Sequence, residues 1–224
     1  MNKNEISISA SLMCADLLNL KNELKLLKEA NINILHYDMM DGHFVPNLGL
    51  SMSLLKNVQK HKDDFVIEAH LMVESPHIFI PILAENNADF IIIHAEVTDN
   101  LFRLIDLIKS HNCKAGIALN PATPLSHIEY VLGEVSLILM MTVEPGYAGQ
   151  KFIDEMIPKI RKLSRIIKKN NYDTIIEVDG NINKNTIPRV VDSGANILVG
   201  GSSGLFRKEY SLKEAAYQML NCHK

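Results

Sequence analysis

The sequence predicts an α/β protein built as a single (β/α)8 TIM barrel over residues 1–224. Short apolar runs rich in Ile, Val and Leu recur along the chain, each is followed by a longer amphipathic segment, and no low-complexity stretch or Pro/Gly/Ser-rich linker divides them. Eight strand-then-helix units are typical of a closed parallel barrel. An open doubly wound sheet is the alternative, but the position after the first strand lacks the Gly-rich turn of dinucleotide-binding folds.

The individual elements follow from hydrophobic patterning. Continuous apolar runs are typical of parallel strands buried on both faces. The predicted strands are 6–10, 34–40, 65–73, 90–94, 115–119, 137–143, 174–179 and 197–200. Apolar residues recur at helical spacing in other segments, with charged residues on the opposite face. The predicted helices are 16–30, with Asp16 as N-cap, and 101–110, 153–169 and 212–220.

Composition excludes several classes of protein. Hydrophobic residues make up 47% and charged residues 22% of the chain, and the net charge of -3 offers no basic excess for nucleic acid. The apolar run 135–143 is shorter than the ~20 residues of a membrane helix. Three dispersed cysteines and an N-terminus without an apolar signal core indicate a cytoplasmic protein with reduced thiols. We expect no nucleic-acid or membrane partner, while assembly into a homo-oligomer is left open.

Ionisable side chains stand at the predicted carboxyl ends of strands, where barrels of this kind carry their chemistry. His36 and Asp38 lie two residues apart and leave the same face of one strand, His70 ends the next strand and Asp179 ends the seventh. This nitrogen and oxygen set predicts one divalent metal ion, with Zn²⁺ favoured and Fe²⁺, Mn²⁺ or Co²⁺ as alternatives. Each residue alone could be a hydrogen-bonded core group, but burying four ionisable groups together is costly unless a metal compensates.

Glycine-rich turns follow the last three predicted strands, at 145–151, at Gly180 and at 201–204. Glycines let backbone N–H groups approach an anion, and barrels often bind phosphate after strands 7 and 8. The alternative is that these turns need glycine for their backbone alone. The absence of the motif GxxxxGK[ST] argues against binding of nucleoside triphosphates. No lysine stands at a predicted strand end, which argues against Schiff-base chemistry.

These residues resemble the ribulose-phosphate 3-epimerase family over nearly the whole chain. The matching blocks are SLMCAD at 11–16, HYDMMDGHFVPN at 36–47, HLMV at 70–73, NPATP at 120–124, MTVEPG at 141–146, GQKF at 149–152 and EVDG at 177–180. The resemblance implies a barrel of the phosphate-binding type, His36, Asp38, His70 and Asp179 as metal ligands, and Asp38 and Asp179 as the acid–base pair. It also implies that a small-molecule sugar phosphate is held by Ser11, Gly146, Tyr147, Ala148, Gly149, Gly180, Gly201 and Ser202.

Further substrate contacts are expected inside the barrel mouth. His36 and His70 are expected to face the substrate together with the metal. The thioethers of Met40, Met72 and Met141 can line a reacting sugar without donating competing protons, although packing of the core is an equally simple role for them.

The implied reaction is metal-dependent epimerisation of a ketose phosphate at C3, through an enediolate, by a carboxylate on each face of the sugar. The SLMC start at 11–14, the FRLID segment at 102–106 and the SGLF ending at 203–206 look more like the D-allulose-6-phosphate 3-epimerase branch. Two departures from the common family pattern, Asn181 in place of a frequent glycine and a turn at 201–206 that is one residue longer, fall where a longer sugar would require the phosphate site to be adjusted. The expected substrate is therefore D-allulose 6-phosphate, which yields D-fructose 6-phosphate. The alternatives are epimerisation of D-ribulose 5-phosphate to D-xylulose 5-phosphate and, from another class, a metal-free phosphosugar-binding barrel.

Overall fold

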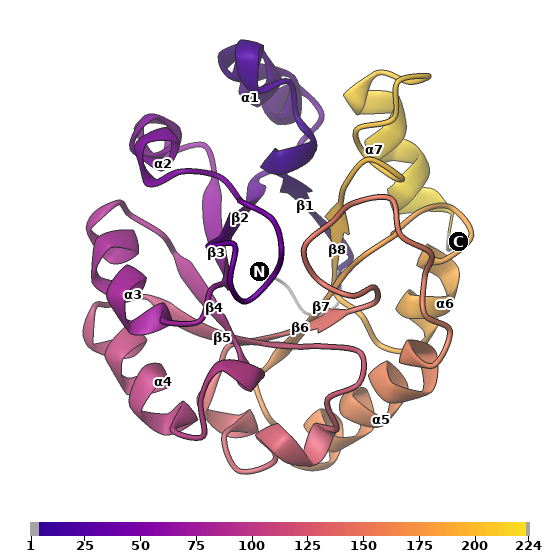
Figure 1. Ribbon diagram of the computed structural model, residues 1–224. Coiled ribbons are helices and arrows are strands. Elements are labelled where there is room, and N and C mark those ends of the chain that lie inside the picture. The colour runs from indigo at the N-terminus through magenta and orange to yellow at the C-terminus, as the bar shows by residue number, and fades with distance from the viewer. Residues whose placement is uncertain (1–4, 223–224) are drawn as a thin grey trace.

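Within residues 5–222, which the computed structural model describes, eight parallel strands close into a barrel in the order β1 to β8 (Figure 1). The predicted TIM barrel is confirmed, while positions 1–4 and 223–224 of its expected span lie outside the described residues. The strands are β1 Ser7–Ser11, β2 Ile34–Met40, β3 Val66–Met72, β4 Phe90–His94, β5 Lys114–Leu119, β6 Leu137–Met141, β7 Ile175–Asp179 and β8 Ile197–Gly200.

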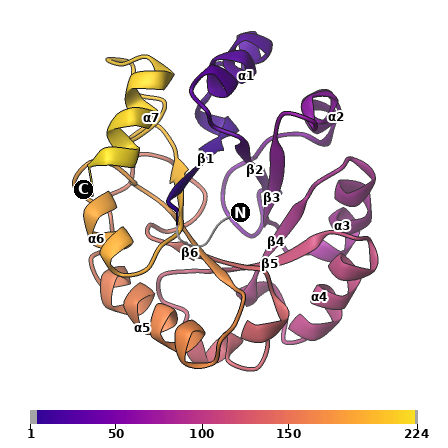
Figure 2. The same cartoon turned by 180° about the vertical axis from the view of Figure 1, so that it is seen from behind.

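Helices surround the barrel, as the views from both sides show (Figures 1 and 2). They are α1 Leu20–Glu29, α2 Met52–Val58, α3 Pro76–Glu85, α4 Leu101–Ser110, α5 Met156–Lys169, α6 Ile187–Asp192 and α7 Leu212–Asn221. The first predicted helix begins late, because Asp16 caps the 3₁₀ turn Leu17–Asn19 and the α-helix starts only at Leu20. Between β5 and β6, two 3₁₀ turns, Leu125–Ile128 and Leu132–Glu134, stand in place of an α-helix.

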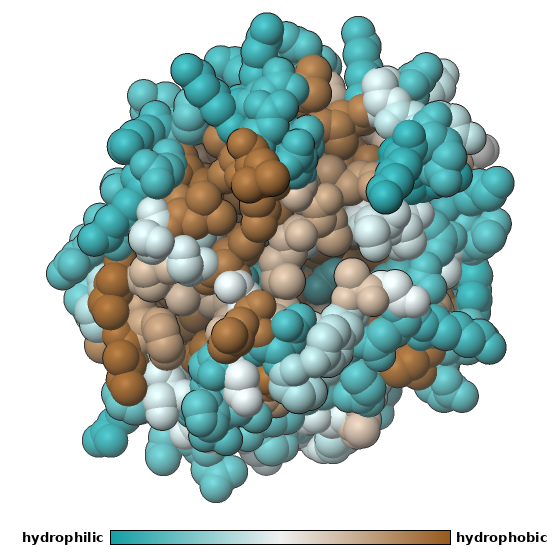
Figure 3. Space-filling model, turned by 45° about the horizontal axis from the view of Figure 1, so that its top comes forward, coloured by the Kyte–Doolittle hydropathy of each residue, from teal (hydrophilic) through white to brown (hydrophobic). Residues whose placement is uncertain are grey.

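The outer surface is mostly polar. Figure 3 shows a hydrophilic rim around one face, with apolar residues gathered inside it. Leu18, beside α1, and Leu48, in the loop after β2, are among the exposed apolar side chains. No helix in the described part of the chain combines the length and the apolar character that crossing a bilayer demands.

Two apolar layers bury both faces of the strands, which explains their continuous apolar runs. On β2, the side chains of Leu35, Tyr37 and Met39 belong to the layer between barrel and helices, and Ile34 belongs to the barrel interior. The interior cluster consists of Ile34, Phe90, Ile92, Ala118, Leu137, Leu139, Met141, Ile175, Ile197 and Val199.

The strand register decides which polar residues share the barrel interior. His36 pairs with Glu68 and Asp38 with His70 across β2 and β3, while Met141 pairs with Asp179 across β6 and β7. Because alternate residues of a strand face the same side, His36 and Asp38 follow Ile34 into the interior. The ionisable residues therefore lie toward the carboxyl ends of the strands.

The barrel interior should be sensitive to lost volume. Ile92 is fully buried, and substitution Ile92→Ala should lower the free energy of unfolding by about 2–5 kcal/mol in urea denaturation, because it leaves a cavity in a closed layer. Ile78 on α3 is 54% exposed, so the control Ile78→Ala should change that free energy by no more than about 0.5 kcal/mol. Equal losses in the two variants would contradict this description of the core.

Candidate active site and metal centre

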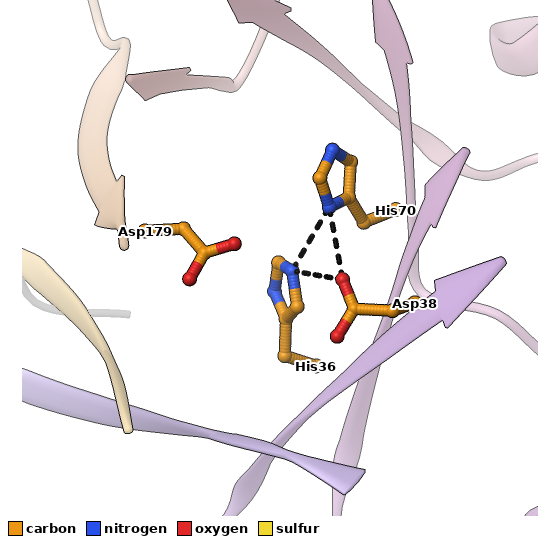
Figure 4. A group of neighbouring side chains, drawn as sticks. All are labelled: His36, Asp38, His70 and Asp179. Carbon is orange, nitrogen blue, oxygen red and sulfur yellow. Dashed lines mark hydrogen bonds and ion pairs between the residues drawn. The ribbon is translucent and has the colours of Figure 1, made fainter. Parts of the chain in front are cut away.

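Three polar atoms meet at the carboxyl ends of β2 and β3 (Figure 4). His36 Nε2 lies 3.2 Å from His70 Nδ1 and 3.2 Å from Asp38 Oδ1, and His70 Nδ1 lies 3.1 Å from the same oxygen. The two histidines are fully buried and Asp38 is nearly so. The β2–β3 register produces this triangle, because it places Asp38 beside His70 while His36 precedes Asp38 on the same face.

This donor set fits a divalent metal. Four ligands at tetrahedral Zn²⁺ distances of about 2.0–2.1 Å lie roughly 3.3 Å from one another, close to the edges of the triangle. Two imidazole nitrogens and a carboxylate oxygen that face each other cannot all be satisfied by mutual hydrogen bonds, whereas a cation accepts electron pairs from all three. Burial lowers the pKa of His70 to about 3, so its imidazole is neutral, as a metal ligand must be.

Asp179 at the end of β7 faces the triangle from across the barrel mouth (Figure 4). One of its carboxylate oxygens lies within 4.8 Å of the three triangle atoms, so the four residues form one cluster able to hold an ion. The predicted convergence of His36, Asp38, His70 and Asp179 is therefore present in the fold.

The two aspartates have different surroundings. The Asp38 side chain accepts a hydrogen bond from Ser11 Oγ at 2.9 Å. Although burial alone acts in the opposite direction, His36 and His70 lower the pKa of Asp38 well below its ordinary value. Burial, reinforced by the charge of Asp38 and opposed by His36, raises the pKa of Asp179 to about 6. Their environments push the two pKa values apart, as in acid–base pairs.

A second polar layer lies beneath the triangle. Glu68 and Glu177 are fully buried, and Ser9 Oγ donates to Glu68 Oε2 at 2.6 Å. His36 Nδ1 lies 3.5 Å from Glu177 Oε1 and 3.9 Å from Glu68 Oε2. Burial, followed by the charge of Glu68, raises the pKa of Glu177 to about 8, so this carboxyl holds a proton at neutral pH. Carboxyl groups thus stand behind the ring of His36, on the side away from the triangle.

A cavity opens above the triangle, and it is lined by most of the predicted substrate residues and by the predicted acid–base pair, Asp38 and Asp179. These are Ser11, Asp38, Met40, Met72, Met141, Gly146, Tyr147, Ala148, Gly149, Asp179, Gly180, Gly201 and Ser202. His36 and His70 do not line it. They lie fully buried, and one ring nitrogen of each, His36 Nε2 and His70 Nδ1, points into the triangle. The lining also includes Cys14, which was not predicted as a site residue, together with Gln150 and Ser203 of the predicted glycine-rich turns and Asn181 beside Gly180.

Hydrogen bonds join the loops around the cavity. Asn47 Nδ2, after β2, donates to Gly146 O at 2.7 Å, and the Tyr147 hydroxyl donates to Pro46 O. Asn181 Nδ2, after β7, donates to Gln150 O at 2.7 Å. The glycine-rich loop after β6 is therefore tied to its neighbours on both sides.

Polar residues beyond the four-residue cluster were also missed as parts of the site. Glu68 lies two residues before His70 on the same strand face, and Glu96 lies two residues after His94. His70 Nε2 contacts His94 Nε2 at 2.9 Å, and His94 Nδ1 contacts Glu96 Oε2 at 3.2 Å. The two-residue spacing from His70 could have predicted that Glu68 faces the barrel interior. Glu96 lies in the 3₁₀ turn Ala95–Val97, where the alternation of a strand does not predict the direction of a side chain.

Comparisons with known proteins agree with this geometry. A model of the ribulose-phosphate 3-epimerase family matches residues 7–206. A ribulose-phosphate 3-epimerase from Methanocaldococcus jannaschii is 46% identical over 222 residues, which cover 96% of this chain and 93% of that protein. A protein of the same name from Bacillus subtilis is 43% identical over 199 residues, covering 88% and 91%. The chain belongs to the ribulose-phosphate 3-epimerase family, and it is therefore an isomerase that epimerises a ketose phosphate at C3.

Solved structures of lower identity support the fold alone. A 3-hexulose-6-phosphate synthase from Salmonella typhimurium has a TM-score of 0.69 at 15% identity, covering 97% of this chain and 98% of the other. A 3-keto-L-gulonate-6-phosphate decarboxylase from Vibrio cholerae also has a TM-score of 0.69, at 11% identity, covering 98% and 97%.

Gly180 should tolerate no side chain. Its φ of +120° disfavours other residues, and a Cβ there would lie 2.6 Å from Val143 Cγ2 and 2.8 Å from Val143 N. Gly180→Ala should therefore lower the free energy of unfolding in urea by about 1–3 kcal/mol. At Gly201 the nearest atom to a Cβ is Cys14 Sγ at 3.6 Å, so the control Gly201→Ala should be nearly neutral for stability. An equally stable Gly180→Ala protein would show that this backbone is not constrained.

Proposed function

We propose that this chain interconverts D-ribulose 5-phosphate and D-xylulose 5-phosphate, with a divalent metal held by His36, Asp38, His70 and Asp179. The observation that carries the proposal is the pair of carboxylates from β2 and β7, which face each other across one cavity mouth with the histidine nitrogens between them. The names of the two relatives support the pentulose phosphate over the hexulose phosphate expected from the sequence.

The two departures that suggested D-allulose 6-phosphate have backbone explanations. Asn181 has a φ of +51°, a left-handed conformation that asparagine tolerates better than most residues, so it replaces glycine without changing the turn. In the turn after β8, a Cβ at Gly204 would lie 2.5 Å from Ile182 O and 3.1 Å from Met219 Sδ of α7. Packing against Ile182 and α7 therefore accounts for the glycine at position 204.

The proposed chemistry needs a proton removed from one face of C3 and returned to the other. Asp38, held by Ser11 and the two imidazoles, is suited to accept a proton as a carboxylate. Asp179, with its raised pKa, is suited to donate one from the opposite side. When the reaction runs in reverse, the two residues exchange these roles.

A metal bound at the cluster supplies Lewis-acid stabilisation of the negative charge that develops when the proton leaves C3. The chain supplies the surroundings of the reaction. Met40, Met72 and Met141 line the cavity with groups that donate no protons, and the turns at Gly146, Gly180 and Gly201 offer backbone N–H groups at the end suited to the phosphate. A metal-free phosphosugar-binding barrel would not need the buried histidine–aspartate triangle.

A direct test compares two substrates. The ratio kcat/KM should be higher for D-ribulose 5-phosphate than for D-allulose 6-phosphate by about 10–200-fold, because one carbon of misfit between phosphate and ketone contributes about 1–3 kcal/mol. Coupled assays of both sugars with the same enzyme preparation provide the measurement, and unphosphorylated D-ribulose serves as the control for phosphate recognition. Equal or better turnover of D-allulose 6-phosphate would restore the hexulose alternative.

Removal of one carboxylate should separate proton exchange from epimerisation. Asp38→Asn and Asp179→Asn should each lower kcat by about 10²–10⁴-fold, since each removes an acid–base group. In deuterated water, each variant should still exchange the C3 proton of a single epimer, the one whose proton faces the remaining carboxylate. Mass spectrometry of both ketose phosphates checks this expectation.

The control for this experiment is Asp41→Asn. Asp41 follows β2 near the same mouth, but its carboxylate accepts from the backbone of His43, Phe44 and Glu74 and lies outside the four-residue cluster. This variant removes a nearby charge and should keep most of the activity. Exchange of both epimers in either carboxylate variant would argue against two bases on opposite faces.

A further inference from the structure

His94 ends β4 and is fully buried, yet it belongs to neither the metal cluster nor the cavity wall. Its ring stacks on that of His70, with ring centroids 5.0 Å apart and planes inclined by 27°. On its other side it packs against Phe44, with centroids 4.6 Å apart. His94 Nε2 lies 2.9 Å from His70 Nε2. A hydrogen bond between these two nitrogens requires that one carries a proton and the other does not.

Glu96 decides the direction of that hydrogen bond. Its Oε2 lies 3.2 Å from His94 Nδ1, and a carboxylate only accepts, so Nδ1 of His94 carries a proton, and in the neutral imidazole Nε2 is then bare. The bare Nε2 then accepts from His70 Nε2–H. As a result, His70 Nδ1 holds a lone pair and points it at His36 Nε2 and Asp38 Oδ1. The opposite direction would leave a bare nitrogen facing a carboxylate and would place a proton at the centre of the cluster.

Glu96 is itself fixed by the neighbouring strand and helix. Its Oε1 accepts from Asn120 N at 2.9 Å, just beyond β5. Burial opposes its charge, but hydrogen bonds from His94, Thr123 and Asn120 lower the pKa of Glu96 to about 2. Lys159 of α5 donates to Asn120 O at 2.9 Å and so holds that backbone in place. The carboxylate is therefore anchored independently of the metal cluster.

We propose that Glu96 and His94 are positioning residues that hold His70 in the tautomer whose Nδ1 is free to bind the metal. This inference rests on the proposed function in that it takes the cluster to be a metal site. It assigns to Glu96, which does not line the cavity, a role exerted through the hydrogen bonds of two neighbouring imidazoles. Residues that orient a metal-bound histidine in this way typically contribute 10–100-fold to metal affinity.

The test uses the full-length protein and two kinds of variant. Glu96→Ala removes the acceptor that orients His94, and His94→Phe keeps a ring between His70 and Phe44 but offers no acceptor to His70. Competition with a chelator should show a Zn²⁺ dissociation constant about 10–100-fold higher for both variants than for the wild type. His94→Gln returns an amide oxygen as acceptor and should recover affinity to within about tenfold of the wild type. The control Glu134→Ala, at an exposed ion pair with Lys109, should leave Zn²⁺ affinity unchanged.

A second measurement is independent of activity. Long-range ¹H–¹⁵N spectra report which nitrogen of His70 carries the proton, and they should be recorded before and after Zn²⁺ is added. The wild type should carry it on Nε2 in both states, and Glu96→Ala should shift it toward Nδ1 before Zn²⁺ is added. A wild-type His70 protonated on Nδ1 would overturn the proposal, as would variants with unchanged tautomer and unchanged Zn²⁺ affinity.

Failure of the positioning role can be distinguished from failure of the proposed reaction. If neither ketose phosphate is epimerised by Zn²⁺-loaded protein, the proposed reaction fails, while the tautomer and the affinities still decide the role of Glu96. If epimerisation proceeds but Glu96→Ala binds Zn²⁺ as the wild type does, with the same His70 tautomer, only the positioning role fails.

Discussion

The register between β2 and β3 places Asp38 beside His70, and the rest of the site depends on that pairing. A shift of one residue would turn Asp38 outward into the apolar layer occupied by Tyr37 and Met39, where an ionised carboxylate has no partner. The apolar residues that flank the site on both faces of β2 therefore hold its geometry. Packing and chemistry are specified by the same alternation of side chains.

The barrel interior tolerates so many ionisable groups because each is placed against another. Behind His36 stand Glu68 and Glu177, and behind His70 stands His94 with Glu96. Both imidazoles of the cluster thus have a carboxyl group on the side away from it, His36 directly and His70 through a second ring. Outer partners of this kind fix the orientation of metal-binding histidines, and the low dielectric of the interior strengthens their interactions.

The fold and the four-residue cluster were predictable because they follow from strand periodicity. Continuous apolar runs located the strands, and the spacing of His36 and Asp38 placed both side chains on one face. Contacts made by residues outside strands were not predictable in this way. Glu96 contacts His94 from a 3₁₀ turn. The hydrogen bond from Asn47 to Gly146 joins segments that lie far apart in the sequence. The packing of Gly204 against α7 was likewise not predictable, because this contact is invisible in the sequence.

The four residues of the cluster come from distant parts of the chain. Three of its members arrive early in the chain, on β2 and β3, while Asp179 comes with β7, near the C-terminus. His36 spans the same interval, because its two ring nitrogens face Asp38 on its own strand and Glu177 on β7. A chain in which β7 is not yet in place has an incomplete four-residue cluster and leaves one side of the His36 ring without its partner. A complete cluster thus requires strands from both halves of the barrel, β2 and β3 from the first and β7 from the second.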